Sequence, residues 1–184
     1  MNFIKHSNLK GLHAPFSASK YHWLNYDDEK ALIVYENLKA KEMGTRLHNW
    51  AKETIDLGIK QPRSSKTLYS YVNDAIGYGM DTEILLYYSK YFFGTADCIS
   101  FKRNMLRIHD LKTGKTPAHM EQLLIYAALF CLEYDFSPDE IDIELRIYQN
   151  DEIEVCTPDP DEVIEVMDKI IHLNSLLEDY DMEE

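Results

Sequence analysis

Three charged residues near the middle of the 184-residue sequence have types and a spacing that suit metal chemistry. Asp97 lies in one predicted strand, and Asp110 and Lys112 lie two residues apart at the end of the next. Because side chains alternate across a strand, Asp110 and Lys112 project from the same face. A turn at residues 102–104 brings Asp97 level with them. Two carboxylates beside one ammonium make a site for Mg²⁺ or Mn²⁺, where the lysine can orient or deprotonate a metal-bound water.

Two further motifs flank this group along the chain. Residues 44–48, GTRLH, place His48 on a predicted helix before the strands, and Gln122 and Tyr126 lie four residues apart on a predicted helix after them. The four-residue spacing puts an amide and a phenol on one helical face, where they can hold substrate phosphate or the network of active-site side chains. Each pattern also has a structural interpretation: an exposed salt bridge at a strand end, a packed or surface histidine, and a core tyrosine.

In this order the motifs resemble those of the PD-(D/E)xK nuclease superfamily, in which an acidic residue is followed, after a variable gap, by acid-x-Lys. Residues 44–48 are similar to the Gly-Thr-x-x-His element of its RecB-like branch, and residues 122–126 to that branch's Gln-x-x-x-Tyr element. Residues 17–19 and 23–25 are similar to the N-terminal Ser-x-Ser and Trp segment of phage-encoded members. The resemblance covers about residues 17–134.

The resemblance implies a metal-dependent DNA nuclease, with an exonuclease in phage DNA recombination, repair or replication as the favoured form. It assigns Mg²⁺ or Mn²⁺ binding to His48, Asp97, Asp110 and the carbonyl of Leu111. It assigns catalysis to Asp97, Asp110, Lys112, Gln122 and Tyr126, the last two also binding substrate. Glu83 is a further candidate ligand, whereas Glu53, five residues beyond the helical histidine, points away from it.

Cysteine usage departs from part of the branch. Some relatives bind an iron–sulfur cluster through four cysteines, but the three cysteines here, Cys98, Cys131 and Cys156, are widely spaced and contain no CxxC pair. We therefore expect no iron–sulfur cluster. The helicase phosphate loop, GxxxxGK(S/T), is also missing from the sequence. The pattern predicts a nuclease module without a helicase portion.

Charge is distributed unevenly along the chain, whose net charge is −13. Residues 1–132 carry 17 basic and 13 acidic side chains, whereas residues 133–184 carry two basic and 19 acidic ones. Because acidic surface repels phosphate, we expect DNA to follow the basic side. That side is formed by residues such as Lys60, Arg63, Lys66, Arg103 and Lys115, of which Arg103 and Lys115 are the named substrate-binding candidates. Few basic contacts favour a free DNA end over the middle of a duplex.

The acidic third leaves a second interpretation open. Charge runs usually form a solvated face. The alternative function is therefore a nuclease-like, non-catalytic binding or inhibitor protein, whose acidic face mimics DNA or contacts a basic partner. A homo-oligomer and a recombination partner protein are left open as well.

Hydrophobic periodicity predicts an α/β fold. The first third is helical, with one helix or two over about residues 28–58 depending on whether Gly44-Thr45 interrupts it, and another helix capped by Ser64 or Ser65. Three strands follow at residues 83–89, 91–102 and 105–111, then a helix from Pro117 to about residue 134. A hairpin turning at residues 150–151 and an amphipathic helix complete the chain. The buried face of that helix is predicted from Val163, Val166, Ile170 and Leu173.

These elements predict a central mixed β-sheet with an antiparallel catalytic meander, flanked by helices and restriction-endonuclease-like. One domain over residues 1–184 comprises an N-terminal helical part at about 17–80, a catalytic core at about 83–134 and an acidic hairpin and helix at about 138–184. The longest apolar run, residues 123–132, is too short for a bilayer, which takes about 20 residues. Because the N-terminal segment also lacks a secretory signal, we expect a cytoplasmic protein, in the host cytoplasm if phage-encoded, with DNA and no membrane as partners.

Overall fold

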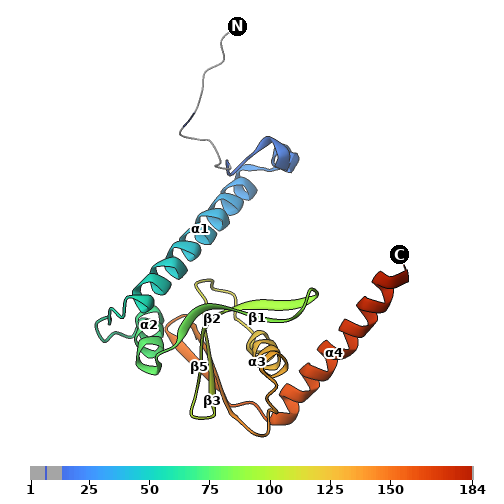
Figure 1. The fold of residues 1–184 in the computed structure, drawn as a ribbon. Coiled ribbons are helices and arrows are strands. Elements are labelled where there is room, and N and C mark those ends of the chain that lie inside the picture. The colour runs from blue at the N-terminus through green and yellow to red at the C-terminus, as the bar shows by residue number, and fades with distance from the viewer. Residues whose placement is uncertain (1–6, 8–13, 184) are drawn as a thin grey trace. The chain divides into compact units, whose positions relative to one another are not determined.

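The computed structural model describes residue 7 and residues 14–183, so most of the N-terminal segment behind the cytoplasmic expectation lies outside it. The chain has an α/β fold in which helices flank a five-stranded mixed sheet (Figure 1). This confirms the predicted α/β class with a central mixed sheet flanked by helices. The elements are η2 (Ala18–Asn25), α1 (Asp28–Asp56), α2 (Thr67–Tyr78), β1 (Asp81–Ser89), β2 (Phe92–Lys102), β3 (Met105–Leu111), α3 (Glu121–Tyr134), β4 (Asp142–Gln149), β5 (Glu152–Cys156) and α4 (Pro160–Glu183).

The chain forms two compact units, residues 1–46 and residues 47–184, with the division inside α1. In the first unit, the indole N–H of Trp23 donates to the Ser17 carbonyl at 2.9 Å and closes the 3₁₀ helix η2. The Asp27 carboxylate caps α1 by accepting from the Lys30 N–H at 2.7 Å. The second unit contains the sheet and every candidate site residue. The prediction of one domain stays a prediction.

Helix α1 continues through Gly44-Thr45 without a break. One glycine inside a helix costs about 1 kcal/mol relative to alanine, which is not enough to end a helix of 29 residues. The Thr45 hydroxyl donates back to the Lys41 carbonyl at 3.2 Å, a contact that a threonine inside a helix can make. The interpretation as two helices is therefore wrong.

Strand order in the sheet follows the sequence, β1-β2-β3-β4-β5. Strands β1, β2 and β3 form the predicted antiparallel meander, β4 lies parallel to β3, and β5 returns antiparallel to β4. Arg103 and Asn104 make the β2–β3 turn with φ of 52° and 63°, and Asn150 and Asp151 make the β4–β5 turn with φ of 51° and 61°. Positive φ at both central residues is the two-residue turn that matches the twist of paired strands.

The sheet separates two hydrophobic clusters, with α2 on one face and α3 and α4 on the other (Figure 1). On β3, Leu106 and Ile108 pack in the cluster of α3 and α4, while Leu111 packs in the cluster of α2. Strand β3 is therefore covered on both sides. Its neighbouring polar residues, His109 and Asp110, face different layers.

Three helix details differ from the sequence prediction. Helix α3 begins at Glu121 and not at Pro117. Helix α2 begins at Thr67, and no side-chain hydrogen bond caps it. On α4, Val163 and Ile170 are buried as predicted, whereas Val166 and Leu173 are half-buried. In the part of the chain that the structure describes, no helix is both long and apolar enough to cross a membrane.

Candidate active site at the end of strand β3

The two aspartates lie side by side at the point where β2 and β3 stop pairing. The last paired residues of that ladder are Cys98 and His109, so Asp97 and Asp110 come directly after it. The backbone N–H of Leu111 donates to Asp97 Oδ2 at 3.1 Å. The carboxylate of β2 is therefore fixed against the backbone of β3, and the predicted level placement of the two aspartates is confirmed.

Asp110 and Lys112 form a half-buried ion pair on the α3 face of the sheet. The Lys112 Nζ lies 2.9 Å from Asp110 Oδ2 and donates to Asp110 Oδ1 at 3.2 Å. The carboxylate is 3% exposed and the lysine side chain 30% exposed. The Oδ2 atom is paired with the ammonium by charge but accepts no hydrogen bond from the described residues. Its hydrogen-bonding capacity thus stays open inside the protein.

The environment of Asp110 favours its neutral form. Burial, and after it the nearby Asp97 carboxylate, raise its pKa, Lys112 and His48 act in the opposite direction, and the net result is a rise from 3.8 to about 6. Asp110 therefore combines an oxygen that accepts no hydrogen bond with a raised pKa, whereas a structural carboxylate is usually fully hydrogen-bonded. Both properties are typical of a functional site.

Helix α3 completes a chain of polar contacts that begins at Lys112. The Lys112 Nζ donates to Gln122 Oε1 at 2.8 Å, and Gln122 Nε2 donates to the Tyr126 hydroxyl at 3.1 Å. The Tyr126 ring lies against β2 at Gly94, where an added Cβ would come within 2.9 Å of it. The predicted shared face of Gln122 and Tyr126 is confirmed, and it faces the lysine.

His48 and Glu83 approach the same place from α1 and β1. The His48 Nδ1 lies 3.6 Å from Asp97 Oδ2, with side chains 37% and 27% exposed. Glu83 lies on β1 between Thr82 and Ile84, which pair with Cys98 and Ala96 on either side of Asp97, and its carboxylate lies 4.0 Å from the Lys52 ammonium. Its φ of 51° is left-handed, a conformation that costs a non-glycine residue about 1–2 kcal/mol. Such strain next to polar residues is characteristic of functional sites, and no sequence signal marks it.

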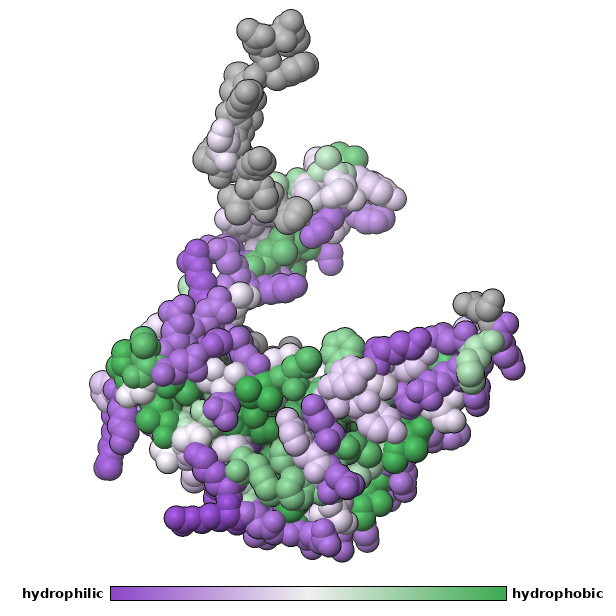
Figure 2. Space-filling model, in the orientation of Figure 1, coloured by the Kyte–Doolittle hydropathy of each residue, from purple (hydrophilic) through white to green (hydrophobic). Residues whose placement is uncertain are grey.

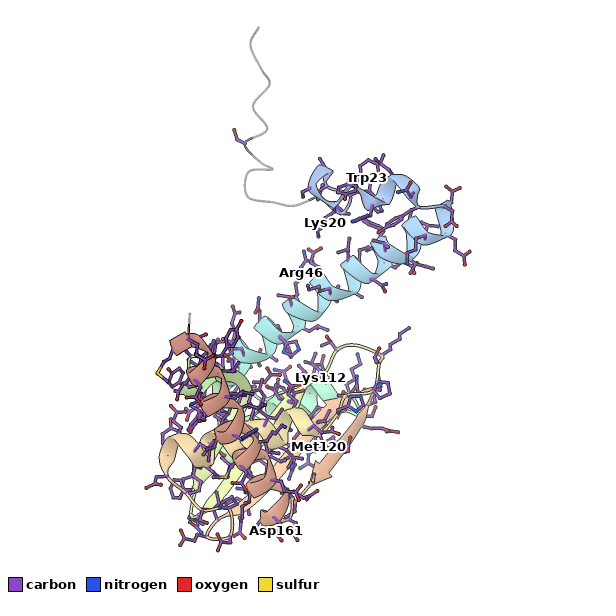
Figure 3. The ribbon with its side chains drawn as sticks, turned by 90° about the vertical axis from the view of Figure 1, so that its right-hand side faces the viewer. Lys20, Trp23, Arg46, Lys112, Met120 and Asp161 are labelled. Atoms are coloured by element: carbon purple, nitrogen blue, oxygen red, sulfur yellow. The ribbon has the colours of Figure 1, made fainter. Side chains whose placement is uncertain are left out.

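Gln149, which the sequence analysis missed, holds the loop between Lys112 and α3. Its Nε2 donates to the carbonyls of Gly114 at 2.6 Å and Thr116 at 2.8 Å, and its Oε1 accepts from the Ala118 N–H at 3.0 Å. Figure 3 labels the two ends of this loop, Lys112 and Met120. Because the loop joins Lys112 to the helix of Gln122, its conformation sets the contact between them.

The basic substrate-binding candidates fall at opposite ends of the sheet. Lys115 lies exposed in the loop after β3, at the site end. The Thr67 N–H donates to Asp151 Oδ1 at 3.3 Å, which places Lys66 and the start of α2 at this end too. Arg103 lies in the β2–β3 turn, about 20 Å from Asp110 at roughly 3.3 Å per strand residue. The structure therefore does not bring Arg103 to the site.

The donor set fits a magnesium-type cation. Among the described residues, no three His, Cys, Asp or Glu side chains are gathered closely enough to form a complete metal cage. Magnesium does not need one, because it is usually held by one or two carboxylates, with waters and substrate phosphate completing the shell. The open acceptor of Asp110 beside Asp97 supplies this minimal set.

The comparison with protein families gives one finding. The model of a family described as a protein of unknown function, DUF2800, matches residues 81–179, from β1 into α4. The match includes Asp97, Asp110, Lys112, Gln122 and Tyr126, and His48 lies outside it. Neither the curated proteins nor the solved structures give a match.

Proposed function

We propose that this chain, which belongs to the DUF2800 family because that family's model covers more than half of it, is a metal-dependent nuclease that hydrolyses DNA phosphodiester bonds. The observation that carries the proposal is the contact chain from Asp110 through Lys112 to Gln122 and Tyr126, with Asp97 alongside. The motifs come from four separate segments, yet in space they converge. We propose in addition that the chain is a RecB-like member of the PD-(D/E)xK superfamily with a restriction-endonuclease-like fold, which its mixed sheet and antiparallel meander support.

Each residue has a role that follows from its position. Asp97, Asp110, His48 and the Leu111 carbonyl would hold one or two Mg²⁺ or Mn²⁺ ions. A bound cation supplies Lewis-acid polarisation of the phosphate and lowers the pKa of the attacking water. Lys112 orients that water and offsets the charge that develops on the phosphate.

The half-buried environment of Lys112 makes it effective. Its ammonium is fixed between a carboxylate oxygen and an amide oxygen, so little reorganisation is needed during the reaction. Gln122 fixes the ammonium from the α3 side, and the hydroxyl of Tyr126 accepts a hydrogen bond from the glutamine amide. Both α3 side chains can therefore contact substrate and position the lysine together.

The distribution of basic residues supports a path for DNA along the site end of the sheet. Lys66 and Lys115 lie at that end, and Lys60 and Arg63 precede α2 in the same basic loop. Residues 133–184 carry only two basic side chains against 19 acidic ones, so they offer little to phosphate. With few basic contacts available, a free DNA end is easier to hold than the middle of a duplex, which favours an exonuclease.

The direct test is hydrolysis of DNA by purified protein. Linear duplex, linear single strand and relaxed closed circles are incubated at equal nucleotide concentration with Mn²⁺, with Mg²⁺ or with EDTA. We expect metal-dependent loss of the linear substrates and slow cutting of the circles. Rapid cutting of circles would indicate an endonuclease, and no hydrolysis of any form would favour the non-catalytic binding protein.

A further inference from the structure

The last helix has an apolar stripe whose side chains become more exposed toward its C-terminal end, where Lys90 and Tyr91 of the β1–β2 turn contact Asp181 and the Leu177 carbonyl. Six residues of α4 repeat with alternating spacings of three and four: Val163, Val166, Ile170, Leu173, Leu177 and Tyr180. This is the heptad pattern of a helix that packs lengthwise against another helix. We call these six residues the α4 seam.

The side chains of the α4 seam become more exposed from Val163 toward Tyr180. Val163 and Ile170 are buried in the cluster shared with α3, and Val166 and Leu173 are half-buried. Leu177 is 37% exposed and Tyr180 61% exposed. Exposed apolar side chains lie among hydrophilic ones on the surface of the protein (Figure 2). A seam whose last positions lie in water is one that another helix would cover.

A groove on the body of the protein continues this exposed end. It has a volume of about 590 Å³ and lies between α3 and α4, with Phe92, Leu124, Ile125, Val166, Ile170 and Leu173 as its apolar lining. Its charged lining consists of Glu121, Glu165 and Lys169. From Val166 to Tyr180 the apolar strip is about 21 Å long at roughly 1.5 Å per residue. An open strip of that length suits a helix better than a small molecule.

Charge decides between a second copy of this chain and a different partner. Helix α4 carries eight acidic residues and Lys169 as its single lysine or arginine. Around the exposed end of the seam, Glu178, Asp179 and Glu183 are acidic, while Leu176 and Met182 are apolar. Asp181 is acidic too and pairs with Lys90 of the β1–β2 turn at 2.6 Å. Two α4 helices laid together would place these carboxylates against each other, whereas lysine and arginine would pair with them.

We propose that the α4 seam and the adjoining groove bind a partner helix that has an apolar stripe flanked by lysine or arginine. The site is separate from the end of β3, although α3 contributes to both. Glu121 and Ile125 line the groove, while the neighbouring Gln122 and Tyr126 belong to the candidate active site. A helix bound in the groove would therefore lie beside the substrate path.

The test uses a synthetic three-heptad peptide with leucine at the two seam positions and lysine at the flanking positions. Its binding to the full chain is measured by fluorescence anisotropy at about 0.15 M salt, where weak surface attraction is screened. A matched peptide with glutamate in place of lysine is the first control. We expect the lysine peptide to bind at least about tenfold more tightly than the glutamate peptide.

Variants on α4 distinguish binding through the side chains of the α4 seam from nonspecific attraction between opposite charges. Leu177→Ala should weaken binding of the lysine peptide by about fivefold or more, because it removes a contact in the seam. Met182→Ala, which changes a 77% exposed residue off the seam, should change binding less than about twofold. Equal binding by Leu177→Ala and wild type would mean nonspecific attraction to an acidic protein and would overturn the proposal. A dimer in sedimentation equilibrium that Leu177→Ala dissociates would also overturn it, since the occupant would then be a second copy.

Discussion

Neighbouring residues of β3, His109 and Asp110, take part in two polar clusters on opposite faces of the sheet, and these clusters differ in how completely they are closed. On the α2 face, the Tyr148 hydroxyl donates to Asp74 at 2.7 Å and lies 3.3 Å from His109 Nδ1. Arg146 donates to the same Asp74 carboxylate at 3.3 Å. Each of these hydrogen bonds joins two side chains of the cluster, although the Asp74 side chain is 33% exposed.

On the α3 face the contacts run outward. Asp110 has an open acceptor, Lys112 is 30% exposed, and Gln122 lies at the surface. His109 also lacks a partner, at Nε2, and both side chains are buried, but Asp110 Oδ2 lies 2.9 Å from the partly exposed ammonium of Lys112. Burial favours the neutral form of both residues, lowering the pKa of His109 to about 3 and raising that of Asp110 to about 6. The carboxylate of Asp74 accepts hydrogen bonds from Tyr148 and Arg146, whereas Asp110 Oδ2 accepts none from the described residues. The comparison teaches that an unused acceptor beside a second carboxylate, and not a shifted pKa alone, distinguishes a candidate site from a structural network.

The largest expected effect is on turnover when the lysine is removed from the open cluster. Lys112→Ala should lower the rate of DNA hydrolysis by about 10³-fold with the fold intact, because it removes a preorganised charge next to the reacting phosphate. Steady-state kinetics measures the rate of hydrolysis, and circular dichroism checks that the variant is folded. Lys115→Ala, in the same loop, is the control and should raise KM with little change in kcat. Near-normal turnover by Lys112→Ala would show that the ion pair is only structural.

Removing the buried charge of the open cluster should stabilise the protein. The pKa of Asp110 rises from 3.8 to about 6 on folding, so its contribution to stability is full below about pH 4 and is lost as pH rises through 6. At about 1.4 kcal/mol per pKa unit, Asp110→Asn should raise the free energy of unfolding near neutral pH, without metal, by about 2–3 kcal/mol. Urea unfolding at pH values of about 4 and 7.5 measures the difference. A variant less stable than wild type near neutral pH would refute the prediction.

Substitution in the cluster on the α2 face should lower, and not raise, the free energy of unfolding. Tyr148→Phe leaves Asp74 and His109 without the hydroxyl and should lower the free energy of unfolding by about 1–2 kcal/mol, while the turnover of the folded protein stays the same. Tyr69→Phe, at a half-buried tyrosine for which no hydroxyl hydrogen bond is found among the described residues, is the matched control and should change little. A large loss of turnover in Tyr148→Phe would move part of the site to the α2 face.

The smallest effect concerns the loop that joins β3 to α3 and contains residues 114–118. Gln149→Ala removes three hydrogen bonds from residues 114–118 and should loosen the contact between Lys112 and Gln122, lowering turnover by about tenfold. Trypsin should also cut faster after Lys112 or Lys115. Gln61→Ala, whose side-chain amide donates within its own loop to the Ile59 carbonyl, serves as the control. Unchanged cleavage by trypsin would show that Gln149 does not fix the loop.

Much of this arrangement can be predicted from the sequence because it depends on local periodicity. Alternation along residues 105–111 defines β3, and the two-residue turn at Arg103 and Asn104 fixes the register that brings Asp97 level with Asp110. The four-residue spacing of Gln122 and Tyr126 likewise sets their shared face. Local pattern therefore suffices wherever neighbours in sequence determine the geometry.

The parts that the sequence does not show depend on contacts from distant segments. Helix α3 starts four residues later than Pro117 suggests, because Gln149 of β4 holds the intervening loop in a non-helical form. The left-handed Glu83 has no glycine or asparagine to mark it. Arg103 lies far from the site because its turn is at the opposite end of the sheet. The number of basic residues along the sequence does not show at which end of the sheet each one lies.

The central claim is that a divalent cation completes the open cluster, and calorimetric titration of Mn²⁺ into the metal-free protein tests it most directly. The account predicts a binding isotherm in the wild type that is lost or weakened at least about tenfold in Asp97→Asn and Asp110→Asn. Asp74→Asn, which changes the carboxylate of the closed cluster, should bind Mn²⁺ like the wild type. Equal Mn²⁺ affinity in the wild type, Asp97→Asn and Asp110→Asn would contradict the account.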